Sequence, residues 1–268
     1  MEIPINKIIC GDNVAVLSKF PNDCIDLTVT SPPYDNLRNY KGYSFDFEIL
    51  AKELYRVTKP GGIVVWVVGD ATIDGSETGT SYKQALYFKE IGFNLHDTMI
   101  YEKNSSTFPA NKKSKRYSQI FEYMFVFSKD ELKTFNLIID KENKWAGYKD
   151  FSGILKNPVP KYSPRINIWI YTTSFNTKTN HPAIFPEKLA RDHIISWSNE
   201  GDIVLDPMCG SGTTLVEAKK LNRRYIGIDI SKEYCEISRK RVIIDREHFE
   251  AVELGEKLNS EDFKDLMI

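Results

Sequence analysis

Residues 203–229 have the sequence IVLDPMCGSGTTLVEAKKLNRRYIGID. The apolar residues 203–205 predict a strand, a glycine-rich turn follows, residues 214–221 predict a helix, and residues 225–230 predict a second strand. Glycines in such a turn let backbone N–H groups approach a ligand at the carboxyl edge of a sheet. The order strand, helix, strand predicts one unit of a parallel sheet, with the turn at its ligand-binding edge.

The same alternation continues through the rest of the chain. We expect strands at 7–10, 25–30, 63–68, 96–101 and 123–127, and helices at 13–20, 45–57, 81–91, 186–197 and 232–245. Residues 63–68 are apolar on both faces, as a central parallel strand is. Repeated βα units predict an α/β fold, with a doubly wound, mostly parallel sheet in one domain over residues 1–268. Periodicity fades between 140 and 178, where prolines recur, so we expect an inserted region at about 130–178.

Charge and composition limit the partners. The chain has 268 residues and a net charge of −1, yet residues 101–178 carry 14 Lys and Arg against 7 Asp and Glu. Such a basic segment suits a phosphate backbone, although a solvated surface of mixed charge would look the same. No apolar run approaches the ~20 residues of a membrane span. The four cysteines are scattered, which favours reduced thiols in a cytoplasmic protein and no metal site.

The turn at Asp206–Thr213 indicates a nucleoside cofactor. Asp229 ends the next strand, where an acidic side chain is placed to accept hydrogen bonds from a ribose diol. The phosphate-loop pattern GxxxxGK[ST] is absent, which argues against ATP, and so is the full GxGxxG pattern of NAD enzymes. A ligand without a pyrophosphate, such as S-adenosylmethionine, suits the turn better. A purely structural turn is the alternative.

A second motif, Thr30-Ser31-Pro32-Pro33-Tyr34, follows the strand expected at 25–30. Two consecutive prolines hold the backbone extended and remove two N–H donors. The Pro32 carbonyl and the Ser31 hydroxyl then offer acceptors beside the aromatic face of Tyr34. Such a site suits a planar base that carries an amino group, although a rigid turn with a packing tyrosine would give the same sequence.

Together the motifs resemble those of the amino-methyltransferases of DNA. Ser31-Pro32-Pro33-Tyr34 resembles their catalytic motif, and Asp206 to Gly212 resembles their cofactor motif. The catalytic motif comes first, which is the order of the permuted β class in restriction–modification systems. Cys10-Gly11-Asp12-Asn13 resembles the segment whose acidic residue meets the adenine of the cofactor. Met208 and Cys209 stand where the family often has an aromatic residue, so we expect no ring stacking on the cofactor there.

The resemblance implies a Rossmann-like methyltransferase fold and S-adenosylmethionine as cofactor. It also implies double-stranded DNA as substrate and a target-recognition region after Lys129, and it allows a partner restriction endonuclease and a homodimer. The catalytic residues would be Ser31, Pro32, Pro33 and Tyr34. The cofactor residues would be Asp12, Asp206, Pro207, Cys209, Gly210, Ser211, Gly212, Thr213 and Asp229. The cluster Lys112, Lys113, Lys115 and Arg116 is expected to bind DNA phosphates, and Arg165 among others could line the same groove.

Several reactions remain to be distinguished. Ser-Pro-Pro-Tyr is more typical of enzymes that make N4-methylcytosine, and N6-methylation of adenine is the alternative. Carbon-5 methylation of cytosine requires a cysteine, typically after proline, and no Pro-Cys pair occurs. RNA or protein amide methyltransferases share a similar Pro-Pro-Tyr motif but usually place the cofactor motif before it. A regulator that binds the cofactor without catalysis would not need an intact catalytic motif.

Overall fold

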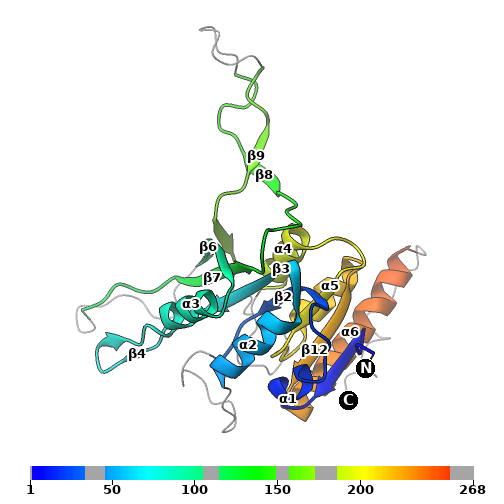
Figure 1. Cartoon of the computed structure of the whole chain (residues 1–268). Coiled ribbons are helices and arrows are strands. Elements are labelled where there is room, and N and C mark those ends of the chain that lie inside the picture. Colours follow the sequence, from blue (N-terminus) through cyan, green and yellow to red (C-terminus); the bar gives the residue numbers. More distant parts are fainter. Residues whose placement is uncertain (1, 34–45, 105–114, 149–156, 173–185, 254–268) are drawn as a thin grey trace.

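The computed structural model describes residues 2–33, 46–104, 115–148, 157–172 and 186–253, with side chains as far as residue 243. Its centre is an eight-stranded sheet in the order β1-β12-β11-β2-β3-β7-β6-β10 (Figure 1). The strands, in that order, are Lys7–Cys10, Arg224–Asp229, Ile203–Asp206, Ile25–Thr30, Thr58–Val68, Phe121–Ser128, Asn94–Lys103 and Ile168–Tyr171. Only β7 runs antiparallel to its neighbours in this sheet, so the expected mostly parallel sheet is confirmed.

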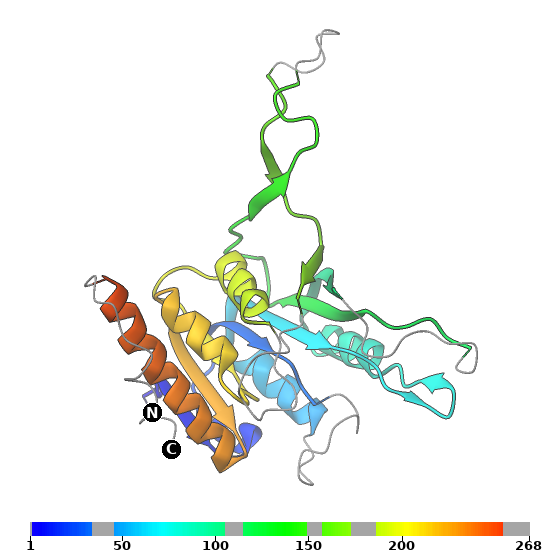
Figure 2. The same ribbon diagram turned by 180° about the vertical axis from the view of Figure 1, so that it is seen from behind.

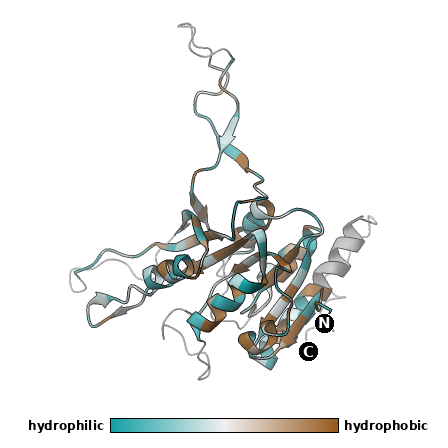
Figure 3. Ribbon diagram, in the orientation of Figure 1, coloured by the Kyte–Doolittle hydropathy of each residue, from teal (hydrophilic) through white to brown (hydrophobic). Residues whose placement is uncertain are grey.

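Helices cover both faces of the sheet. α1 (Asn13–Leu17), α2 (Phe47–Val57) and α3 (Thr80–Glu90) lie on one face, and α4 (Glu187–Trp197), α5 (Thr213–Lys220) and α6 (Lys232–Glu253) lie on the other (Figures 1 and 2). Figure 3 shows the hydrophobic residues concentrated on the strands between these layers. Two buried clusters result, one on each side, with Trp66 and Phe88 in the first and Val65 and Leu189 in the second.

The strand β3 shows why its sequence is apolar throughout. Residues from Ile63 to Val68 are at most 1% exposed, and alternate side chains enter opposite clusters. β3 starts at Thr58, five residues earlier than the sequence predicts. Gly61 adopts a φ of +83°, so the strand continues through Pro60-Gly61-Gly62 where the sequence suggested a break. None of the helices in the described residues is long and apolar enough to cross a membrane.

Two small hairpins extend from the sheet. β4 (Thr72–Ile73) pairs with β5 (Ser76–Glu77) beyond the carboxyl end of β3. β8 (Ile139–Glu142) pairs with β9 (Tyr162–Pro164) in an arm that projects far from the body (Figures 1 and 2). This arm lies within the range 130–178 that we expected as an insertion. The same range also contains β10, which pairs with β6 and belongs to the main sheet.

The arm joins the body through a charged cluster at its base. Arg165 donates from Nε to Asp140 Oδ1 at 2.6 Å, across the arm, and from Nη1 to Asp192 Oδ2 at 2.6 Å, on α4. Tyr171 Oη donates to the same Asp192 oxygen at 2.7 Å. Asp192 is 4% exposed, so the buried carboxylate is stabilised by these partners in place of water. Arg165, one of the residues that could line the DNA groove by sequence, is held in this cluster.

Candidate functional site

The two motifs meet where the direction of the chain through the sheet changes. β11 and β2 are parallel neighbours, with Val204 opposite Leu27 and Leu205 opposite Thr28. From β11 the chain passes through α5 to β12 on one side, and from β2 it passes through α2 to β3 on the other side. The loops after the two strands therefore diverge, and open α/β sheets bind ligands in the crevice between such loops.

The turn after β11 needs its glycines for shape. Gly210 and Gly212 have φ values of +49° and +84°, which side chains with a Cβ rarely adopt. A Cβ on Gly212 would lie 2.1 Å from Ser238 Oγ and 3.0 Å from Ser238 Cβ, on α6. The turn closes with Gly212 N donating to Cys209 O at 2.7 Å, and Cys209 N donating to Ile228 O at 2.9 Å ties it to β12. α6 therefore fixes how closely the turn lies to the sheet.

Gly212→Ala is expected to destabilise the protein by more than the ~1–2 kcal/mol of a left-handed alanine, because its Cβ also clashes with Ser238. Gly201 is a matched control, since its φ is +82° and nothing lies within 4 Å of the position of its Cβ. Urea unfolding of Gly212→Ala and Gly201→Ala measures both free energies. Equal losses of unfolding free energy in the two variants would show that the clash with Ser238 does not contribute to the destabilisation.

Asp229 organises the turn from the end of β12. Its Oδ2 accepts from Gly210 N at 2.8 Å and its Oδ1 accepts from Ser231 N at 2.9 Å. Burial raises the pKa of Asp229, while these two backbone bonds oppose the shift. Each carboxylate oxygen has a second lone pair. Asp229 is thus fixed in orientation and keeps acceptor capacity for a hydroxyl of a ligand at the carboxyl edge.

Asp12 lies on the neighbouring strand connection. Cys10 is opposite Asp229 in the sheet, and Gly11 N donates to Asp229 O at 2.9 Å, so Asp12 follows beside the tip of β12. Asp12 caps α1 by accepting from Ala15 N at 2.8 Å. Its exposed carboxylate lies at the same edge as Asp229. The next residue, Asn13, is buried and donates from Nδ2 to Pro207 O at 3.4 Å, a link to the turn that sequence reasoning missed.

Asp206 connects the two motifs. Thr30 Oγ1 donates to Asp206 Oδ1 at 2.8 Å, and Met208 N donates to the same oxygen at 3.2 Å. A second link runs the other way, from Thr214 Oγ1 to Val29 O at 3.2 Å. Asp206 is 2% exposed, so it presents little surface to a ligand. Its role in the fold is to hold the end of β2 against the turn at Asp206–Thr213, hereafter the cofactor turn. The sequence did not predict the hydrogen bond from Thr30.

Asp206→Asn is expected to change the dependence of stability on pH. Burial raises the pKa of Asp206 from 3.8 to about 6, so the folded chain binds this proton more tightly than the unfolded chain. The resulting stabilisation is complete below pH ~4 and is lost as the pH rises towards ~6, a change on the order of 3 kcal/mol. Asparagine keeps an acceptor for Thr30 and Met208 and carries no charge. The variant should therefore gain stability relative to wild type across that window in urea unfolding, and parallel pH curves would contradict the assignment.

The catalytic motif continues directly from β2. Pro32 is buried, whereas Ser31 and Pro33 are partly exposed. Thr30 is buried and bonded to Asp206, so Ser31 and Pro32 begin at a fixed point beside the cofactor turn. Tyr34 lies outside the described residues, and its stacking role stays a prediction.

The other residues that the sequence predicts to bind a cofactor lie in the same turn. Pro207, Cys209 and Ser211 are held between β11 and α5, where Cys209 and Ser211 are buried. Arg241, on α6, donates from Nη1 to Ser211 O at 2.9 Å and lies 3.3 Å from Thr213 Oγ1. The sequence did not predict this contact. Arg241 is one of several charged residues in the predicted helix 232–245, and Thr213 lies 28 residues before it.

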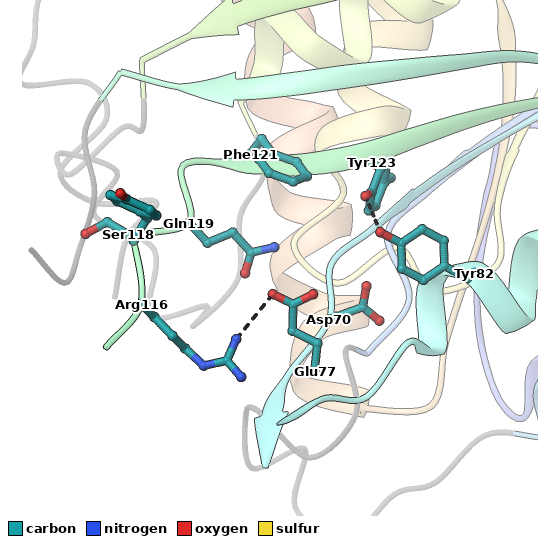
Figure 4. A pocket seen from close by; sticks show the side chains of 9 residues that line it. Asp70, Glu77, Tyr82, Arg116, Ser118, Gln119, Phe121 and Tyr123 are labelled. Atoms are coloured by element: carbon teal, nitrogen blue, oxygen red, sulfur yellow. Dashed lines mark hydrogen bonds and ion pairs between the residues drawn. The ribbon is translucent and has the colours of Figure 1, made fainter. Parts of the chain in front are cut away.

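The expected phosphate-binding cluster is only partly described. Lys112 and Lys113 lie outside the described residues, and Lys115 is exposed with a φ of +50°. Arg116 donates from Nη2 to Gly75 O and lies 3.7 Å from Glu77 Oε1, so it touches the β4–β5 hairpin (Figure 4). A phosphate would have to compete with Glu77 for this guanidinium.

Comparison with known proteins gives a consistent result. A family model described as DNA methylase, of the N6 and N4 type, matches residues 25–240. The orphan methyltransferase M.BamHII of Bacillus amyloliquefaciens is 59% identical over 240 residues, which cover 82% of this chain and 89% of that protein. The DNA adenine methyltransferase YhdJ of Escherichia coli K12 is 30% identical and is covered to 86%, with 92% of this chain aligned.

A solved structure has the same fold. The crystal structure of the M1.HpyAVI–SAM complex superposes with a TM-score of 0.62 at 28% identity, covering 88% of this chain and 98% of that one. The match of the family model extends over both motifs and the strands that carry them. The chain therefore belongs to the family of DNA methylases that modify the N6 or N4 amino group of a base.

Proposed function

We propose that this DNA methyltransferase transfers a methyl group from S-adenosylmethionine to N4 of cytosine in double-stranded DNA. The observation that carries the proposal is the bond from Thr30 to Asp206, because it joins the catalytic motif and the cofactor turn at one edge of the sheet. An acceptor site for an amino group and a site for a nucleoside cofactor are thereby adjacent. Positioning two reactants in this way is a large part of catalysis for a donor that is already reactive.

The residues at the carboxyl edge fit S-adenosylmethionine. Asp229 offers acceptors to the ribose hydroxyls, and Asp12 lies beside it for the adenine end. Gly210, Ser211 and Gly212 let the backbone approach the ligand closely. When bound, S-adenosylmethionine supplies a methyl group on a sulfonium sulfur and leaves as the neutral thioether. The relative whose structure contains SAM, M1.HpyAVI, supports this assignment.

The catalytic motif then positions the amino group. We propose that the flipped base presents its amino hydrogens to the Pro32 carbonyl and to Ser31, which leaves the nitrogen lone pair directed at the methyl group. Transfer of the methyl group from sulfur to this nitrogen would leave one excess proton on the nitrogen, and that proton would pass to water. Ser31 acts as a hydrogen-bond partner and not as a general base, since a serine hydroxyl does not ionise near neutral pH. Tyr34 would stack on the base.

The choice of cytosine rests on Ser31 at the first position of the motif. Adenine is the second candidate, and a specific observation favours it: YhdJ, 30% identical, is a DNA adenine methyltransferase. Both bases present a similar amino edge, so the first motif residue alone does not separate them. RNA or protein amides are further alternatives.

Nucleoside analysis decides among these candidates. Unmethylated DNA is incubated with the protein and S-adenosylmethionine labelled in its methyl group, digested to nucleosides and separated. We expect label in N4-methylcytosine. Label in N6-methyladenine would overturn the choice of base, and label only in RNA or protein supplied in parallel would overturn DNA as the substrate. Ser31→Ala in the same assay should lower turnover more than it weakens cofactor binding.

DNA is expected to lie over the carboxyl edge, between the β8–β9 arm and the segment around Lys115. Lys112, Lys113, Lys115 and Arg116 are proposed phosphate contacts, and the arm is the proposed target-recognition region. We place the enzyme in the cytoplasm with the DNA that it modifies. The name of M.BamHII, an orphan methyltransferase, favours action without a partner endonuclease. A homodimer, which the resemblance allows, is tested by the mass of the protein in solution.

A further inference from the structure

A cavity lies on the carboxyl edge, near the catalytic motif. It has a volume of about 380 Å³. Its walls come from the β4–β5 hairpin, α3 and the start of β7 (Figure 4). The lining includes Asp70, Glu77, Tyr82, Gln119, Phe121 and Tyr123. Among the described residues, neither the turn at 206–213 nor residues 30–33 of the catalytic motif line it, and it lies outside the proposed recognition region.

The cavity is two strands away from Ser31. β2, β3 and β7 are neighbours in that order, Thr30 is opposite Trp66, and Val68 is opposite Tyr123. Strands lie ~4.8 Å apart, so the cavity begins roughly 10 Å from the catalytic motif. One base cannot hold its amino group at Pro32 and fill this cavity as well. Nucleotides of one DNA strand are about 3.4 Å apart along the axis, so the cavity is within about three nucleotides of the target.

The walls suit a base better than a phosphate. Phe121 and Tyr123 lie edge to face, with ring centres 5.4 Å apart and planes at 82°. Tyr82 Oη lies 2.6 Å from Tyr123 Oη, and burial together with this bond raises the pKa of Tyr123 to about 12, so the hydroxyl stays neutral. Asp70 and Glu77 outweigh Arg116 in charge. An anionic phosphate is therefore disfavoured inside, whereas aromatic rings and acceptors favour a planar group with N–H donors.

Gln119 is the side chain that can identify such a base. It is exposed, and its amide points into the cavity towards Glu77 and Asp70 (Figure 4). Within the part of the chain that the structure describes, no hydrogen bond engages this amide. Asp70, by contrast, already accepts from Ser81 N at 2.9 Å and from Thr78 Oγ1 at 3.3 Å. A glutamine amide pairs in bidentate fashion with N6 and N7 of adenine.

We infer that this cavity reads an adenine within about three nucleotides of the methylated base, through Gln119. The inference rests on the proposed DNA methylation, and it adds a specificity-determining residue outside the β8–β9 arm. A bidentate amide–adenine pair discriminates by ~1–3 kcal/mol, which is roughly 5- to 150-fold. Exchange of the amide for another group of the same size should change the preferred base at one position and leave the other positions unaltered.

The test uses a random duplex library and three variants. Wild type, Gln119→Leu, Gln119→Glu and the control Glu90→Gln, at the exposed far end of α3, each methylate the library with S-adenosylmethionine. Direct sequencing maps the modified bases and their neighbours. In parallel, the DNA that each protein retains without methylation is sequenced. The binding measurement still reports base preference if the wild type methylates no DNA, so failure of the proposed function and failure of this inference give different results.

Wild type and Glu90→Gln should prefer adenine at one position near the target by about fivefold or more. Gln119→Leu should reduce that preference to about twofold, and Gln119→Glu should shift it towards cytosine, whose N4 donates to a carboxylate. Binding of S-adenosylmethionine should not change. An unaltered sequence preference in both Gln119 variants would overturn the inference. So would an equal loss of rate or affinity at all sequences, which a phosphate contact or a structural role would produce.

Discussion

Replacement of Asp229 by alanine is expected to weaken the binding of S-adenosylmethionine on the order of 100-fold. Two effects add. The ribose hydroxyls lose the proposed carboxylate acceptor, and hydrogen bonds to a charged group contribute about 1.5–3 kcal/mol each. The turn also loses the acceptor that fixes Gly210 N at 2.8 Å and Ser231 N at 2.9 Å. Titration calorimetry with S-adenosylmethionine measures the dissociation constant directly.

Two variants control this experiment. Asp229→Asn keeps acceptor capacity and should lose less affinity than Asp229→Ala. Asp23 precedes β2 at the opposite edge of the sheet, where its carboxylate pairs with Lys129 at 2.7 Å. Asp23→Ala should leave cofactor binding unchanged. If Asp229→Ala binds the cofactor like wild type while remaining folded, the nucleoside site lies elsewhere on the sheet.

Arg165→Ala is expected to lower the free energy of unfolding by about 3 kcal/mol, because removal of one partner leaves a buried charge uncompensated. Asp192 would keep Tyr171 and the exposed Lys188, whose Nζ lies 3.5 Å away. Asp140 would lose the guanidinium that lowers its pKa. The β8–β9 arm would then lose the ion pair that joins it to α4, so under the proposed function affinity for DNA should fall while affinity for S-adenosylmethionine is retained.

Lys188 provides the matched control. It meets the same carboxylate from an exposed position, and exposed ion pairs contribute ~0–1 kcal/mol. Lys188→Ala should therefore change urea unfolding much less than Arg165→Ala. The double variant Arg165→Ala with Asp192→Asn should recover part of the lost stability, since no buried charge is left unpaired. Equal losses for Arg165→Ala and Lys188→Ala would contradict the role assigned to the cluster.

The sequence predicted most of the sheet because its strands obey one simple rule. The central strands β3 and β11 are covered on both faces, so residues 63–68 and 203–205 are continuous apolar runs that stand out between helices. The edge strand β10 was not predicted. Its burial alternates, with Trp169 and Tyr171 buried and Ile168 and Ile170 exposed, and it follows a segment rich in proline that masks so short a pattern.

The candidate site was predicted unevenly for a related reason. Asp229 and the glycines stand out because their roles are local: a strand end and a tight turn. Thr30, Asn13 and Arg241 act on residues 176, 194 and 28–30 positions away. Nothing in the sequence near them indicates a partner at such a separation. The expected role of Arg165 changed for the same reason, since Asp192 reaches it only through the tertiary fold.

The pairing of β1 with β12 brings Cys10 opposite Asp229 and so determines when the enzyme becomes active during its synthesis. β1 leaves the ribosome before β12, which follows it by more than 200 residues. At ~5–20 residues per second the gap lasts on the order of 10–40 s. Contacts between such distant segments form slowly, because the chain must lose the entropy of closing a long loop before the contacts can stabilise it. A nascent chain therefore carries its proposed catalytic motif without a complete cofactor site, and under the proposed function methylation can begin only after β12 has been made.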